Sequence, residues 1–200
     1  MGFFKKLSSP IRIQHFLDKI EYDADPASRS PRYVIREKKA HCFEGALFAA
    51  AALRQLGFRP LLVDLRAVND DDHVIAVFKE NRCWGAVAKS NFTTLRFREP
   101  VYRNLRELAM SYFDFYFNTL GEKTLRSYSL PLNLSRFDSR NWMTTDEELE
   151  YIGDSLDEIK HINLINHKII LQKADKHVLQ AGLLGAKKDG LYKPKPKRKF

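Results

Sequence analysis

The chain has 200 residues, a formal net charge of +9, and 44% hydrophobic and 12% aromatic residues. This is enough apolar material for one domain with a buried core. No apolar run reaches the roughly 18 residues that a membrane-spanning helix needs, so we expect no transmembrane segment. The first residues lack the apolar stretch of a secretory signal, and two cysteines do not make a disulfide framework. We therefore expect a cytoplasmic protein.

The positive charge is concentrated at the C-terminus. From Lys187 to Phe200 the chain carries seven lysines and arginines and a single acid, Asp189. Alternating lysine and proline predict an extended, disordered segment. We therefore divide the chain into a single domain, residues 1–185, and a basic tail, residues 186–200. Such a tail is suited to weak contact with nucleic acid or an anionic surface, and equally to keeping the protein soluble.

The N-terminal region predicts a helix and then a loop. Residues 11–20 have apolar side chains at helical spacing, and Ser8 or Ser9 before Pro10 provides a cap with proline in the first turn. Residues 22–36 are rich in aspartate, proline, serine and arginine, which predicts a loop.

Residues 41–57 are the stretch around which the chain is organised. Alanine and leucine dominate it, and Gly57 stands where a left-handed helix cap is expected. Because almost every face of this helix is apolar, we expect it to be buried. Cys42 stands in its first turn, where free N–H groups and the helix dipole stabilise a thiolate.

Short strands joined by tight turns follow this helix. We expect strands at residues 61–66, 73–78 and 83–89 and an edge strand at 94–98, with a hairpin turn at 79–82. The pattern predicts an α+β fold in which the cysteine-bearing helix packs on an antiparallel sheet, followed by C-terminal helices. Those later helices are expected within residues 101–120, 145–159 and 162–179. The sequence contains no phosphate-binding glycine loop and no CxxC pair, so we expect no cofactor and no metal site.

Four residues form a candidate catalytic site. A cysteine nucleophile needs an imidazole to take its proton and a third group to orient that imidazole. Cys42 opens the buried helix, and His73 opens a central strand. The next strand ends near Ser90 and Asn91, and the length of the hairpin turn decides which of the two lies on the histidine's face. Asn91 is chemically the better orienter, because its amide oxygen accepts from an imidazole N–H, and Ser90 is the second choice.

The helix and the strand after it resemble the core of the transglutaminase-like superfamily. The resemblance is carried by Cys42, Gly45-Ala46-Leu47, Ala52-Leu53-Arg54, Leu56-Gly57 and Pro60-Leu61-Leu62-Val63, with His73 on a following strand. It covers under a third of the chain and implies a cysteine at the start of a buried helix and a histidine on a strand. The family usually has an aspartate about four residues after a tryptophan, whereas here Trp84 is followed by Gly85-Ala86-Val87-Ala88.

The leading hypothesis for function is a cysteine-dependent amide hydrolase or acyl transferase that acts on a peptide, amide or thioester substrate. In it Cys42 attacks the carbonyl, His73 acts as base and then as acid, and Asn91 or Ser90 orients His73. The alternative is an inactive module that keeps the fold and binds a peptide or nucleic acid. The missing aspartate and the basic tail favour that alternative.

Overall fold

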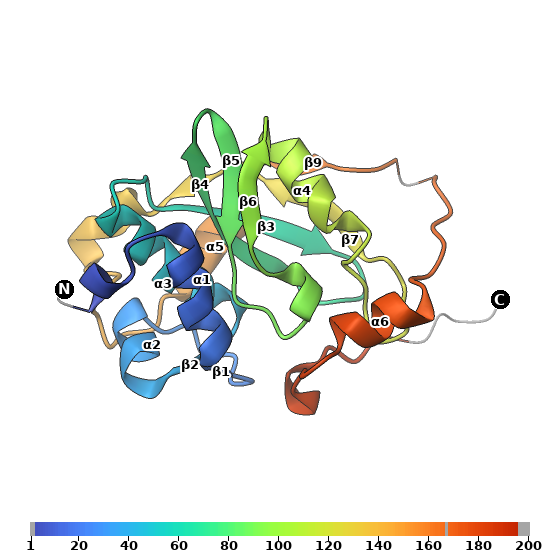
Figure 1. The fold of residues 1–200 in the computed structure, drawn as a ribbon, viewed down its shortest axis with the longest axis horizontal. Coiled ribbons are helices and arrows are strands. Elements are labelled where there is room, and N and C mark those ends of the chain that lie inside the picture. Colours follow the sequence, from blue (N-terminus) through green and yellow to red (C-terminus); the bar gives the residue numbers. More distant parts are fainter. Residues whose placement is uncertain (1–2, 167, 196–200) are drawn as a thin grey trace.

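The computed structural model describes residues 3–166 and 168–195 (Figure 1). Its α-helices are α1 (Pro10–Lys19), α2 (Pro31–Glu37), α3 (Cys42–Gln55), α4 (Leu105–Phe113), α5 (Glu150–Glu158) and α6 (Lys176–Gly182). Its strands are β1 (Glu21–Tyr22), β2 (Lys39–Ala40), β3 (Leu61–Ala67), β4 (His73–Glu80), β5 (Cys83–Val87), β6 (Arg98–Tyr102), β7 (Leu125–Ser129), β8 (Leu132–Asn133) and β9 (His161–Asn163). Short 3₁₀ turns are η1 (Phe4–Lys6), η2 (Thr93–Leu95), η3 (Leu134–Arg140) and η4 (Lys188–Gly190).

A seven-stranded sheet forms the centre of the molecule. Its strand order is β6-β5-β4-β3-β7-β9, with β8 beside β3, and every pairing in it is antiparallel. Two further strands, β1 and β2, form a separate parallel pair. The α+β fold is therefore confirmed, with the predicted strands β4 and β5 as neighbours joined by a tight turn at Asn81 and Arg82.

The two faces of the sheet carry separate cores. Alternate side chains of a strand point to opposite faces. Along β4, Val74, Ala76 and Phe78 join the core around α3, and Ile75 and Val77 join the core that contains residues of α4. Figure 1 shows α1, α2 and α3 gathered beside the sheet. In α3, every residue from Phe43 to Leu53 is buried, so the prediction of a buried cysteine helix is confirmed.

The helix boundaries follow local capping. Ser9 Oγ accepts from the backbone N–H of Arg12 at 3.4 Å and Pro10 is the first residue of α1, as predicted. Gly57 has φ of 90°, the left-handed conformation expected of the residue that ends α3. Within the described ranges, no helix combines the length and the apolar character needed to cross a bilayer.

Several predicted elements differ from the observed ones. The expected loop 22–36 ends in α2, because Pro31 opens a helix after Ser30. The expected edge strand 94–98 starts inside the 3₁₀ turn η2, and β6 begins only at Arg98. The helix expected at 101–120 is the shorter α4, because residues 101 and 102 belong to β6 and the helix ends at Phe113.

The largest difference lies near the C-terminus. Residues 162–179 were expected to form one amphipathic helix, but the described part of this region contains the end of β9 and the start of α6, and residue 167 lies outside the described residues. Apolar residues at helical spacing do not distinguish a helix from a short strand that completes a sheet. Here β9 pairs with β7 at the edge of the sheet, so tertiary pairing prevails over the local pattern.

Candidate functional site

Cys42 stands at the first position of α3, and its helix turn is capped by its neighbours. His41 is the cap residue, and its Nδ1 accepts from the backbone N–H of Phe43 at 3.2 Å. In return, Glu44 Oε2 accepts from the backbone N–H of His41 at 3.2 Å. His41 and Glu44 therefore form a reciprocal capping box at the start of α3.

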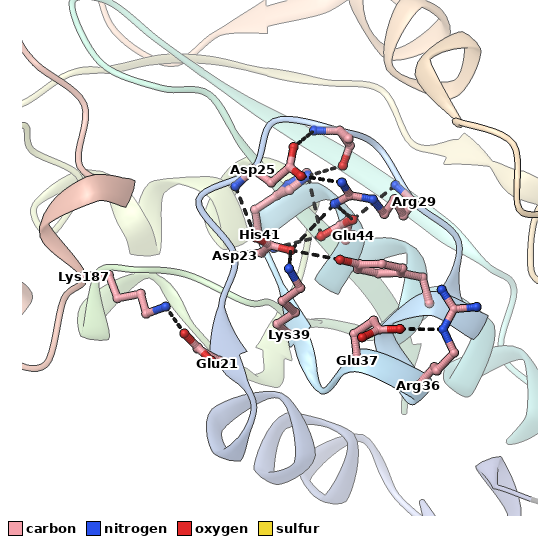
Figure 2. Close-up of polar contacts among 12 residues, drawn as sticks. Glu21, Asp23, Asp25, Arg29, Arg36, Glu37, Lys39, His41, Glu44 and Lys187 are labelled. Atoms are coloured by element: carbon pink, nitrogen blue, oxygen red, sulfur yellow. Dashed lines mark hydrogen bonds and ion pairs between the residues drawn. The ribbon is translucent and has the colours of Figure 1, made fainter.

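A buried ionic network fixes the loop that faces this helix start (Figure 2). Glu44 has no exposed surface, and its Oε1 accepts from the backbone N–H of Arg29 at 3.2 Å. The Arg29 guanidinium lies 3.7 Å from both Glu44 and Asp23, and it also pairs with Asp25. Burial raises the pKa of Glu44 to about 7. The network ties loop 23–29 to the helix that carries Cys42.

His73 is the first residue of β4 and is 4% exposed. It shares its face of the sheet with Ile75 and Val77, and its ring lies 6.4 Å from the ring of Tyr116. Its Nε2 lies 2.8 Å from the carbonyl oxygen of Leu95. A carbonyl can only accept, so Nε2 carries the proton and the lone pair of the neutral ring is on Nδ1.

The four predicted site residues meet at one small cavity. Cys42, His73, Ser90 and Asn91 all line a space of about 50 Å³ at the end of β4. No hydrogen bond joins Cys42 to His73. Instead, Cys42 Sγ donates to the carbonyl oxygen of Asp72 at 3.9 Å. The structure therefore brings the nucleophile and base candidates to the same cavity without pairing them.

Burial keeps both Cys42 and His73 uncharged, whereas the sequence predicted a thiolate at Cys42. A lowered thiol pKa was expected for Cys42, but burial raises the pKa of Cys42 to about 11, although the backbone N–H groups of Val74 and Phe43 oppose this. Burial also lowers the pKa of His73 to about 4. Both groups are neutral at pH 7 in this form, so the expected thiolate–imidazolium pair is absent from it.

The orienting role expected of Asn91 or Ser90 is taken by a backbone carbonyl. The two-residue turn pairs Glu80 with Cys83, and this register continued would place Ser90 opposite His73. However, β5 ends at Val87, because the side chain of Gln14 takes both the N–H and the C=O of Ala88. Ser90 Oγ then accepts from the backbone N–H of Phe92 at 3.0 Å. The prediction of an Asn91 or Ser90 orienter is corrected to the carbonyl of Leu95.

Asn91 instead holds the C-terminal strap, by which we mean residues 186–195. Its Oδ1 accepts from the backbone N–H of Lys187 at 2.8 Å, and its Nδ2 donates to the carbonyls of Lys187 and Gly190, each at 2.9 Å. Further along, Asn69 Oδ1 accepts from the backbone N–H of Lys195 at 2.8 Å. This part of the tail therefore differs from the disordered segment that its composition predicted, and residues 196–200 lie outside the described residues.

A wide cleft of about 870 Å³ opens beside Cys42. Its walls are loop 23–28, α5, the turn between β3 and β4, and residues 189–192 of the strap. Asp64 lies in this cleft, and its Oδ2 lies 3.0 Å from Nε2 of His161. Sequence reasoning missed this pair, because Asp64 and His161 are far apart in the chain and only the folded sheet brings them together. Within the described ranges, no group of three or more His, Cys, Asp or Glu side chains is arranged to hold a metal ion.

Comparison with known proteins adds no relative to this description. No protein-family model matches the chain, and no curated protein matches it either. The resemblance of residues 42–63 and His73 to the transglutaminase-like core therefore stays a prediction from the residue pattern.

Proposed function

We propose that this chain is a transglutaminase-like cysteine hydrolase or acyl transferase, described here in a closed resting form. The observation that carries the proposal is the shared cavity. Cys42 at a helix start and His73, with Nε2 held by Leu95 and the lone pair on Nδ1, line it together. A wide cleft opens onto the same cysteine and supplies room for a substrate.

The reaction follows from these positions. Cys42 Sγ attacks the carbonyl carbon of an amide or thioester while its proton passes to Nδ1 of His73. The backbone N–H of Cys42 at the helix start stabilises the oxyanion. When the tetrahedral intermediate collapses, His73 returns the proton to the leaving amine or thiol, and the acyl group stays on Cys42. Water or an acceptor amine then attacks the acyl group while His73 removes the proton of that nucleophile. The acyl–sulfur bond breaks, and His73 passes the proton to the released Cys42 thiolate.

The closed form accounts for the neutral state of the two groups. Gly190 and Tyr192 of the C-terminal strap line the small cavity together with Cys42 and His73. Burial is the largest cause of the pKa shift at both groups. Displacing the strap admits water, and the pKa values of Cys42 and His73 then move back toward each other.

A binding module without turnover is the second candidate. It is favoured by the thiol of Cys42, which donates to the Asp72 carbonyl, and by His73, which has a carbonyl rather than a carboxylate as its partner. A carbonyl stabilises an imidazolium less than a carboxylate does, because it carries no net charge.

A thiol-directed probe separates the two candidates. A peptide chloromethyl ketone should label the full chain at Cys42 faster than at Cys83 and saturably, and Cys42→Ala should abolish the saturable reaction. Equal, non-saturable labelling of both cysteines would leave only the binding module.

A further inference from the structure

The wide cleft beside Cys42 is strongly acidic. Six of the carboxylates that line it are Asp23, Asp64, Asp71, Asp72, Asp154 and Asp189. No lysine or arginine of the described chain lines it. Asp23 pairs with Arg29 and Lys39, and Arg66 lies 3.9 Å from Asp64 and 3.8 Å from Asp72. Asp71, Asp154 and Asp189 have no ion-pair partner within residues 3–166 and 168–195.

Asp64 supplies a specific hydrogen-bond acceptor in this acidic cleft. Its side chain is 5% exposed, and Oδ2 is occupied by His161. Its other oxygen, Oδ1, is buried and has no hydrogen-bond partner. A buried acceptor that lacks a donor is costly, and native structures contain few of them. In a residue that lines the cleft, an unused carboxylate oxygen is the place where a donor from a ligand fits.

The chemistry of that donor is limited by what surrounds it. The described residues offer no cluster that could hold a metal ion, so we consider an organic cation as the donor. A lysine ammonium or an arginine guanidinium supplies several N–H donors on a long apolar stem. The stem allows the charged group to reach a buried carboxylate while the peptide backbone stays in the open part of the cleft.

We propose that the cleft selects basic peptides, with a lysine or arginine side chain donating to Oδ1 of Asp64. This inference rests on the proposed function only for the position of the acyl group at Cys42. Binding of a basic peptide does not depend on catalysis. The chain's own C-terminus, with its alternating lysines, and an unrelated basic peptide offer the same chemistry.

Binding to full-length Cys42→Ala protein tests this without turnover. The probes are a fluorescent peptide with the sequence of residues 193–200, an unrelated lysine-containing peptide, and both peptides with every lysine Nε-acetylated and arginine replaced by citrulline. At low ionic strength each basic peptide should bind at least about tenfold more tightly than its neutral form, because surface charge is poorly screened there. Equal affinity of the basic and neutral forms overturns the proposal. Binding of the tail peptide alone identifies the C-terminal sequence of this protein as the ligand.

Two pairs of variants locate the receptor. Asp64→Asn should lower the affinity for a basic peptide at least about tenfold, whereas Glu150→Gln, at an exposed carboxylate of the same cleft, should change it less than about threefold. Gly153 also lines the cleft, and a Cβ there meets nothing within 4 Å. Gly153→Lys therefore places a fixed cation in the cleft without disturbing the packing, and it should abolish binding that Gly153→Ala retains.

If Asp64→Asn fails to fold, the comparison of Gly153→Lys with Gly153→Ala still tests the proposal. Full binding by Gly153→Lys overturns the proposal. Failure of the proposed function looks different, because a Cys42 that is never acylated leaves the preference for basic peptides intact.

Discussion

Asn91→Ala should release the C-terminal strap and make Cys42 more reactive. The substitution removes three hydrogen bonds, two to Lys187 and one to Gly190. At about 1 kcal/mol each, the strap loses about 3 kcal/mol, and its open population rises roughly a hundredfold. Lys187 also pairs with Glu21, and Gly190 packs on the ring of Tyr22, so these contacts limit the effect.

The assay is hydrogen exchange of the Lys187 amide, together with alkylation of Cys42. In wild type that amide donates to Asn91, so it should exchange much faster in Asn91→Ala. Ser90→Ala is the matched control, because Ser90 Oγ accepts only from Phe92 and should leave the strap in place. The two possible roles of Asn91 predict opposite changes in the reactivity of Cys42. An orienter of His73 would make Cys42 less reactive when removed, whereas a strap clamp makes it more reactive. Unchanged exchange, or slower alkylation, in Asn91→Ala refutes the reasoning.

Two further predictions concern stability. Burial raises the pKa of Glu44 to about 7 from the ordinary value of 4.5, so between these pH values the folded chain keeps a proton that the unfolded chain releases. Stability therefore falls as pH rises through this range, by up to about 3 kcal/mol, and Glu44→Gln should gain in Tm relative to wild type as pH rises. A difference in Tm that stays constant with pH contradicts this. Gly45→Ala places a Cβ 2.2 Å from the Cβ of Lys89, so it should destabilise by about 1–3 kcal/mol in urea unfolding despite its better helix propensity. Gly153→Ala, in open space, should instead gain up to about 1 kcal/mol, and equal effects at both glycines would contradict the packing argument.

The sequence predicted the centre of the fold because local and tertiary preferences agree there. Residues 41–57 combine helix propensity, an apolar surface and a glycine cap, and they form α3 as expected. The hairpin of β4 and β5 follows from apolar runs on either side of a short turn. Where the preferences conflict, as at β9, pairing with a distant strand decides the outcome.

The sequence predicted which residues lie at the candidate site, but it did not predict the hydrogen bonds that these residues make. The helix start, the strand start and the end of the next strand bring Cys42, His73 and Asn91 to one cavity. The orienter escaped prediction because a backbone carbonyl, that of Leu95, has no residue signature. The charge states also escaped prediction, because they depend on burial, and the strap that contributes to it has the composition of a disordered tail.

The central claim is that Cys42 is the nucleophile and that His73 takes its proton. It is tested most directly by the rate at which a small thioester acylates the full chain, followed by peptide mapping of Cys42 and Cys83 in wild type and in His73→Gln. A glutamine amide can still donate to the Leu95 carbonyl, so the fold should survive. We predict acylation at Cys42 alone, falling at least about a hundredfold in His73→Gln, as expected for loss of a general base. Acylation of both cysteines at similar rates, unchanged in His73→Gln, would contradict the claim.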